Sequence, residues 1–299
     1  MTTVDVSADG GLEDLRETKS FGQKTVEMIK KQPLGTVGFL VVIAMIVMAV
    51  FANYLTPYDP EENDFASMLI APGWEFLLGT DQFGRDIMTR LIYGARTALF
   101  VGFVASFVGA CLGLVLGVMS AYFGGTFDLI FQRVMDVFMA FPLIIMALAI
   151  VSIFGPSTQN VIIAITIPFI PRCARVVRSN ALAIREIPYV DAARALGYTH
   201  ARIILRHMAP NVMAPFLIMI TAFVGQAILL EASLSYLGLG VQEPTAAWGL
   251  MLQGGAEEYI ESEPWIAIFP GIAISLAVFG FNLFGDSVRD VLDPRLRTQ

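Results

Sequence analysis

The sequence predicts an all-α integral membrane protein with six transmembrane helices. Hydrophobic residues make up 56% of the 299 residues and charged residues only 15%, whereas soluble domains are about 45–50% apolar and about 25% charged. Five nearly uncharged runs reach roughly 20 residues, the length at which a helix crosses a bilayer. These runs are Leu34–Ala52, Thr97–Phe123, Val134–Phe154, Val212–Leu230 and Trp265–Phe284.

A sixth span is expected from Asn160–Ile170, which is too short by itself. It reaches the required length if the helix continues to about Val177, with Arg172 and Arg175 extending their side chains toward the surface. The first run also has the apolar character of a secretory signal peptide, but it is longer than such a core and no small-residue cleavage site follows it. We therefore expect the first helix to be retained.

The distribution of basic residues predicts the orientation. Of the 19 lysines and arginines, all but Arg85, Arg90 and Arg96 fall in segments that six spans place on one side. Because cytoplasmic segments carry the excess of positive charge, both termini and the arginine-rich fourth connection are expected in the cytoplasm. Acidic residues gather in the two outer loops, so the net charge of −7 reflects an asymmetry across the membrane. Nothing in the sequence supports nucleic-acid binding.

The N-terminal third divides into a tail and a first span with its outer loop. Residues 1–33 are polar and are expected to form a cytoplasmic tail, and residues 34–96 contain the first helix and the first outer loop. Within Arg85–Arg96, the apolar residues share one helical face and the charged residues lie opposite. This pattern predicts an amphipathic helix that lies on the outer membrane surface.

Small residues recur every fourth position in the second span. They are Ala105, Gly109, Gly113, Gly117 and Ala121. Such a stripe allows another helix backbone to approach closely, which is a common way for helices to associate in lipid. Glycine is also simply frequent in membrane helices, but five small residues in register favour a packing face. The sequence leaves open whether the partner helix belongs to this chain.

A polar segment, Arg185–Asn211, lies between two of the apolar runs and predicts two short helices. Pro188 suits the first turn of the first helix, and Gly197 suits the position just past its end. Thr199 is a suitable N-cap for the second helix, which Pro210 is expected to stop.

One face of the first of these helices carries Tyr189, Ala192, Ala193 and Leu196, and the two alanines would permit a close approach by another surface. Asp191 and Arg194 are three residues apart and are expected to pair. On physical grounds alone, the segment could instead be a loop held on the headgroups by anionic lipid.

The triplet Asp191-Ala192-Ala193, followed by Gly197 and then Pro210, resembles the coupling loop of ABC importer permeases. Aspartate stands where that loop usually has glutamate. The runs Ala192–Gly197 and His207–Asn211 resemble the peptide and nickel branch of the family. Weaker similarities follow in order along the chain: Leu78–Asp86, Tyr122–Gly125, Phe154–Ser157, Leu237–Gly240, Trp248-Gly249 and Phe281–Asp286. The chain is thus identified as a member of this family, most similar to its second, C-type, permease.

The resemblance implies a type I ABC importer transmembrane domain over residues 97–286, with a coupling loop at 185–211 and a cytoplasmic tail at 287–299. It implies a multi-pass protein of a prokaryotic inner membrane. The implied partners are a homologous permease in a heterodimer, two ABC ATPase subunits and an extracytoplasmic solute-binding protein. The residues expected to couple to the ATPases are Tyr189, Asp191, Ala192, Ala193, Gly197, Arg202 and Pro210.

The chain contains no G-x-x-x-x-G-K-[ST] phosphate loop, so ATP hydrolysis is expected in the partner subunits. No catalytic residue, cofactor or metal site is expected in this chain. The substrate stays open among dipeptides, oligopeptides, nickel and oligosaccharides, as do the pathway-lining residues and the role of the acidic loop 242–264.

The alternatives from other classes are a proton-coupled carrier or channel and an intramembrane enzyme. A proton-coupled carrier needs acids deep in several spans, and the apolar runs contain almost none. Asp136 is expected to form a local ion pair with Arg133. Glu231, near the outer end of the fifth span, is expected to be reached by water.

Overall fold

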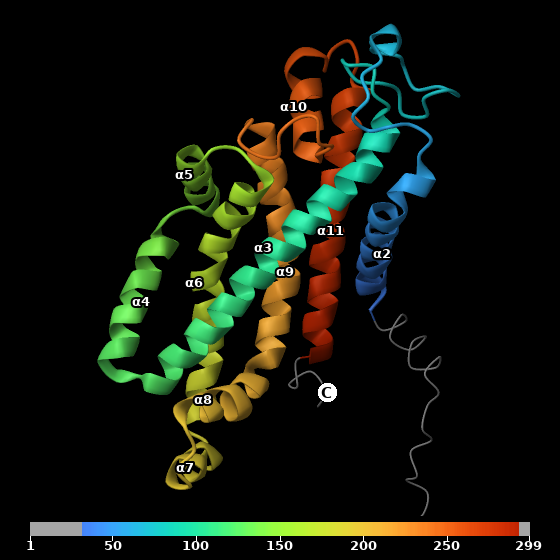
Figure 1. The fold of residues 1–299 in the computed structure, drawn as a ribbon. Coiled ribbons are helices and arrows are strands. Elements are labelled where there is room, and N and C mark those ends of the chain that lie inside the picture. Colours follow the sequence, from blue (N-terminus) through green and yellow to red (C-terminus); the bar gives the residue numbers. More distant parts are fainter. Residues whose placement is uncertain (1–31, 293–299) are drawn as a thin grey trace, which may run out of the picture.

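The computed structural model describes residues 32–292, so the expected tails lie almost entirely outside the described residues. Within that range the chain is helical, without a β-strand; the residues described contain one isolated bridge, between Thr80 and Asp86 (Figure 1). Five segments are long and apolar enough to cross a membrane. They are α2 (Pro33–Leu55), α3 (Ile87–Phe123), α6 (Thr158–Arg185), α9 (Met213–Tyr236) with the turns before it, and α11 (Trp265–Leu292).

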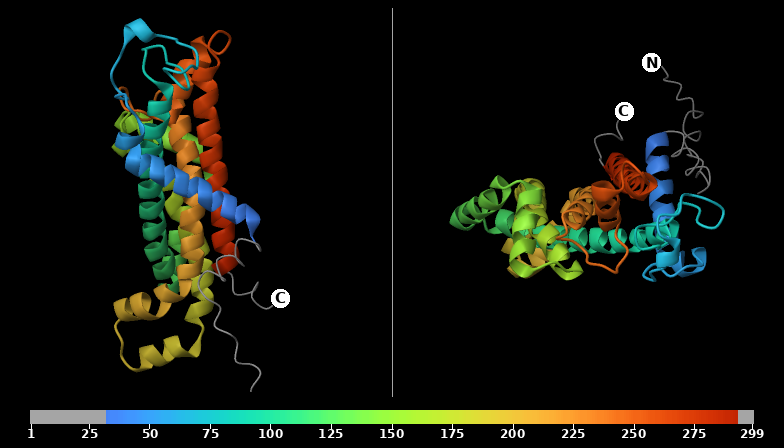
Figure 2. Two further views of the ribbon diagram at one scale, coloured as in Figure 1. Left: turned by 90° about the vertical axis from the view of Figure 1, so that its right-hand side faces the viewer. Right: turned by 90° about the horizontal axis from the view of Figure 1, so that it is seen from above.

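Helix α3 is the centre of the bundle. It packs along α6 and α9, and its first half also packs against α2. Helix α2 crosses the other long helices obliquely, and seen from above the molecule is elongated, with α4 and α5 at one extreme and α2 at the other (Figure 2). The buried side chains accordingly form two clusters, one among α3, α6 and α9 and one among α2, α3, α9, α10 and α11.

The connections separate to the two ends of the bundle. The 56–86 connection, which contains the 3₁₀ turn Phe65–Ser67, and α10 (Trp248–Glu258) lie at one end, called here the α10 end. Helices α7 (Pro188–Ala195) and α8 (His200–Ile203) lie at the opposite end, the α7 end (Figure 1). The first turn of α2 and the last turn of α11 also lie at the α7 end, where Ser287 Oγ bonds to Gln32 Oε1.

The expected third span, Val134–Phe154, is not one straight helix. The chain forms α4 (Gly125–Ala140) and α5 (Leu143–Phe154), which meet at an angle of 89°. Pro142 disfavours helical dihedrals in the residue before it, and Phe141 is indeed extended, with φ −88° and ψ 136°. The 12 residues of α5 span only about 18 Å at 1.5 Å per residue. The chain therefore has six spans only if α4 and α5 together count as one bent span.

The prediction of a separate surface helix at Arg85–Arg96 is also wrong. Residues from Ile87 onward belong to α3, which runs without interruption to Phe123, and the Asp86 side chain caps its first turn by accepting a hydrogen bond from Thr89 N. Ile87, Arg90 and Ala95 are all buried. The apolar residues of this stretch face other helices rather than lipid headgroups, and ion pairs described below compensate the buried arginine.

The small-residue stripe of α3 lies against α6 of the same chain. A methyl group added to Gly109 would approach Phe169, one added to Gly113 would approach Cys173 and Ala174, and one added to Gly117 would come 2.6 Å from the Ala174 carbonyl oxygen. Both ends of the stripe, Ala105 and Ala121, are buried. Helix α6 itself continues well beyond Val177, to Arg185, as the extended reading of the fourth span requires.

Candidate functional site

The local signals for α7 act as expected from the sequence. Pro188 occupies the first turn, where a missing N–H costs nothing. Gly197 follows the capping residue Leu196 with φ +76°, a left-handed conformation that glycine adopts without strain. Arg194 Nη1 lies 3.0 Å from Asp191 Oδ1, so these two exposed side chains pair.

The four residues expected on one face of α7 divide between two surfaces. Ala193 is only 4% exposed and packs with Val190 into the core cluster that contains Ile203 and Met208. Ala192 is exposed, and Leu196 is 73% exposed. Positions 190 and 193 are one turn apart and define the inward face. Ala193 therefore holds α7 to its own chain, while Ala192 and Leu196 are available to a partner.

Thr199 caps α8, because its hydroxyl accepts a hydrogen bond from Arg202 N. Pro210 does not stop the helix, contrary to expectation. The chain passes from α8 through a π turn, η2 (Ile204–Met208), and a 3₁₀ turn, η3 (Ala209–Val212), directly into α9. Changes of helix type of this kind accommodate a residue that lacks an N–H. The α7 segment, defined here as residues 186–212, therefore ends in a break at the base of α9.

Side-chain contacts brace this segment internally and connect it to the long helix α3. Tyr189 Oη donates a hydrogen bond of 2.8 Å to the His207 carbonyl, and Asn211 Nδ2 donates one of 2.7 Å to the same oxygen. At the end of α3, Tyr122 Oη lies 2.7 Å from His200 Nδ1, and the Arg194 guanidinium lies 5.1 Å above the Tyr122 ring. The α7 segment is thus braced internally across the break before α9, and it is joined to α3 by directional contacts.

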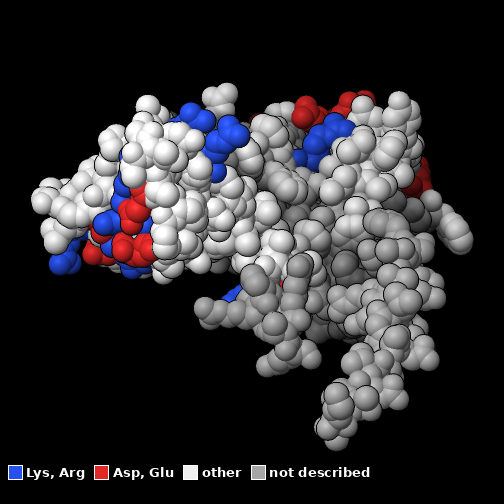
Figure 3. Space-filling view, turned by 90° about the horizontal axis from the view of Figure 1, so that it is seen from below, with Lys and Arg blue, Asp and Glu red and all other residues white. Residues whose placement is uncertain are grey.

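Basic and acidic groups alternate over the α7 end, as Figure 3 shows from below. Arg178 Nε lies 2.6 Å from Asp128 Oδ1, and Asp128 also accepts a hydrogen bond from Ser120. Asp136 pairs with Arg133, as expected, and also with Arg175. Arg202 lies over the ring of Tyr198, and its side chain is exposed. The α7 end therefore presents mostly paired charges of both signs around α7, with Arg202 exposed beside them.

A second cluster ties the α10 end together. The Arg85 guanidinium donates two hydrogen bonds to Glu243 (Nη1–Oε2 2.7 Å, Nη2–Oε1 3.3 Å) and one to Asp81. Burial alone lowers the pKa of the Arg85 guanidinium, but Glu243 and Asp81 outweigh burial and raise it. Arg90 is fully buried, donates to the carbonyls of Pro60 and Pro244, and faces both carboxylates. These arginines fasten the 56–86 connection to the loop after α9.

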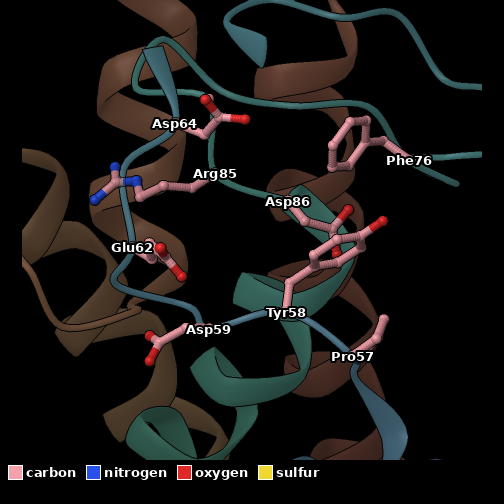
Figure 4. A pocket seen from close by; sticks show the side chains of 9 residues that line it. Pro57, Tyr58, Asp59, Glu62, Asp64, Phe76, Arg85 and Asp86 are labelled. Carbon is pink, nitrogen blue, oxygen red and sulfur yellow. The ribbon is translucent and has the colours of Figure 1, made fainter. Parts of the chain in front are cut away.

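A pocket of about 280 Å³ opens beside this cluster (Figure 4). Its lining includes four acidic side chains: Asp59, Glu62, Asp64 and Asp86. Two of them serve the local backbone, because Asp64 caps the 3₁₀ turn and Asp86 caps α3. At least half of the acidic lining therefore stabilises the local backbone of the 56–86 connection.

Glu231 is buried, although the sequence suggested contact with water. It is 1% exposed and accepts a 2.7 Å hydrogen bond from Ser235, whose hydroxyl in turn accepts one from Val241 N. The acid therefore helps to shape the corner at which α9 ends.

An apolar bundle of five long helices and one bent pair, with a short exposed helix between two spans, defines a polytopic membrane protein. The comparisons specify the family. The chain belongs to the binding-protein-dependent transport system inner membrane components, whose family model matches residues 113–298. A second model, the N-terminal TM domain of oligopeptide transport permease C, matches residues 20–72. The chain is thus an ABC importer permease, and this family assignment decides against a proton-coupled carrier or channel.

Two relatives cover nearly all of the chain. The dipeptide transport system permease protein DppC of Alkalihalophilus pseudofirmus is 42% identical over 286 residues, which are 96% of this chain and 94% of that protein. The glutathione transport system permease protein GsiD of Escherichia coli O6:K15:H31 is 39% identical over 269 residues, which are 90% and 88% of the two chains.

Among solved structures, an inward-facing form of the MetNI methionine ABC transporter matches 69% of this chain and 98% of its own chain. The TM-score is 0.55 at 21% identity, so this similarity concerns the fold alone.

Several contacts of the α7 segment were not foreseen from the sequence. The sequence indicates Tyr122 and the His207–Asn211 run only as parts of motifs similar to those of the family, and it indicates no role for His200. The run His207-Met208-Ala209-Pro210-Asn211 carried a usable signal, because a proline followed by asparagine inside a helical stretch indicates a break with a side chain able to satisfy a freed backbone group.

Proposed function

We propose that this chain, together with a homologous permease, forms the membrane pathway of a peptide importer, and that the α7 segment receives the movement of two ATPase subunits. The observation that supports this proposal most strongly is the position of α7. It is a short exposed helix at one end of the bundle, in the segment that connects the spans α6 and α9.

The exposed surface of α7 includes small and apolar side chains, as expected of a helix that inserts into a groove on another protein. Ala192 is small and exposed, and Leu196 is largely exposed and apolar. An apolar side chain at the tip of a short helix gains free energy when a groove on another protein covers it. The surrounding arginines contribute less, since exposed ion pairs are worth about 0–1 kcal/mol each. Shape at Ala192 and Leu196 should therefore determine docking.

In this proposal the α7 end faces the cytoplasm. The start of α2, the α6–α9 connection and the end of α11 share that end, and these are the segments next to most of the lysines and arginines. The α10 end then faces outward, toward a solute-binding protein. The names of the relatives favour a dipeptide or a short peptide such as glutathione as the substrate class.

The experiment compares Ala192→Trp with Arg206→Ala in the assembled transporter. Ala192 is exposed, so a tryptophan there leaves the bundle intact but prevents close docking. We expect the ATPase subunits to be lost on copurification and uptake of a labelled dipeptide to be abolished, whereas Arg206→Ala retains both. Normal uptake by Ala192→Trp would exclude α7 as the docking helix. Absence of dipeptide uptake by the unmodified transporter would exclude the substrate class.

A further inference from the structure

The break between α8 and α9 lies where the Tyr189 side chain of α7 contacts the π turn that precedes α9. The π turn Ile204–Met208 and the 3₁₀ turn Ala209–Val212 follow each other without an intervening loop, and Pro210 lies at the start of the 3₁₀ turn. Breaks at proline and π turns are the positions at which long helices bend. The break is thus a position at which the chain can bend between α7 and α9.

One backbone oxygen in this break is held by two side chains from different elements. The His207 carbonyl accepts from the Tyr189 hydroxyl at 2.8 Å and from Asn211 Nδ2 at 2.7 Å, and Asn211 Nδ2 lies 3.1 Å from the Tyr189 hydroxyl. Tyr189 stands in the first turn of α7, while Asn211 stands in the last turn before α9. The three groups form a closed triangle across the break.

We propose that this triangle is a latch by which a displacement of α7 is transmitted to α9. Tyr189 and Asn211 are positioning residues in it, and the His207 backbone is the shared point of attachment. The proposal rests on the proposed coupling function of α7. Hydrogen bonds have directional geometry, so the latch fixes the direction in which α9 follows α7, whereas the apolar contacts of Val190 and Ala193 hold α7 in place without fixing that direction.

The His207 side chain has a separate place in the segment. Its ring stacks on Tyr198 at a centroid distance of 5.8 Å, and the buried Nε2 has no hydrogen-bond partner in the range 32–292. Because the latch uses the backbone carbonyl, His207→Phe preserves both the stacking and the attachment point. This variant should therefore transport like the unmodified chain.

The test measures peptide taken up per ATP hydrolysed in the complete transporter reconstituted in vesicles. Tyr189→Phe keeps the ring and removes the hydroxyl, and one lost hydrogen bond corresponds to about a three- to tenfold change. We expect that ratio to fall about three- to tenfold while the ATPase subunits still copurify. The matched control is Tyr198→Phe, because the Tyr198 hydroxyl forms no hydrogen bond among the described residues; it should leave the ratio unchanged.

Asn211→Ala gives the same test without changing α7, and the double variant should be no worse than either single variant, because both side chains act on one oxygen. An unchanged ratio in Tyr189→Phe and Asn211→Ala would overturn the latch. Loss of the ATPase subunits from either variant would overturn it as well, since the residues would then serve docking. Failure of the unmodified chain to copurify with ATPases would instead reject the underlying function.

Discussion

The contact between α3 and α6 makes a sharp prediction about Gly113. A β-carbon at this position would lie 2.5 Å from Cys173 Cβ, 2.9 Å from the Ile170 carbonyl oxygen and 3.0 Å from Ala174 N. Two of these atoms belong to the α6 backbone and cannot rotate away. Gly113→Ala therefore forces the two helices apart, even though alanine is the smallest possible side chain.

The size of the effect follows from the overlap. Non-bonded carbon atoms prefer about 3.5–4.0 Å, so the helices must separate by about 1 Å locally. A gap of that size forfeits about a quarter to a half of the dispersion energy of neighbouring contacts, and overpacking of this kind costs about 1–3 kcal/mol. The neighbouring contacts of Gly109 and Gly117 are loosened at the same time, so we expect a loss near the upper limit, about 3 kcal/mol.

The assay is thermal unfolding of the purified permease complex in detergent. We expect Gly113→Ala to lower the Tm by about 5–10 °C. The control is Gly271→Ala in α11, where a β-carbon meets no atom within 4 Å, and which should not lower the Tm. A Tm unchanged by Gly113→Ala, or lowered equally by both variants, would refute the helix packing described here.

Two further predictions concern the α10 end. Arg90→Met should cost on the order of 3 kcal/mol of stability, because it removes the buried cation that holds two loops while leaving their carbonyls and carboxylates behind. Glu243→Gln should cost less, since Glu243 is 46% exposed and water can hydrogen-bond to the arginine groups that lose the carboxylate. An equal loss of Tm in both variants would contradict this ranking. A single cysteine at the exposed Asp64 should react with a membrane-impermeant thiol reagent in intact cells, and labelling only after lysis would reverse the proposed orientation.

The sequence was sufficient to locate the long helices, because each depends on local composition. Helix α6 illustrates this point. Its apolar start is too short to cross a bilayer, but apart from Pro168 and Pro171 no helix-breaking residue interrupts the sequence through Cys173, and the helix continues. The motif spacing likewise identified the family before any three-dimensional information. These features are encoded within single segments of the chain.

The errors arose where distant segments determine the outcome. Residues 85–96 have the pattern of a surface helix. Two of the arginines are nevertheless buried because they contact Glu243, which lies 158 positions after Arg85 along the chain. For α7, the spacing of Ala192 and Ala193 cannot say which of them faces inward, because that depends on Ile203 and Met208 across the turn. The break at Pro142 was foreseeable as a kink, but its angle depends on how α5 packs against α6.

The central claim is that α7 is the surface to which the ATPase subunits bind, and cross-linking tests it most directly. A photoreactive side chain is placed either at Leu196, which is 73% exposed on the α7 segment, or at Trp74, which is fully exposed in the 56–86 connection at the opposite end. Irradiation of the assembled transporter should join position 196, and not position 74, to an ATPase subunit. Cross-links to the ATPase from position 74, or none from position 196, would contradict the account.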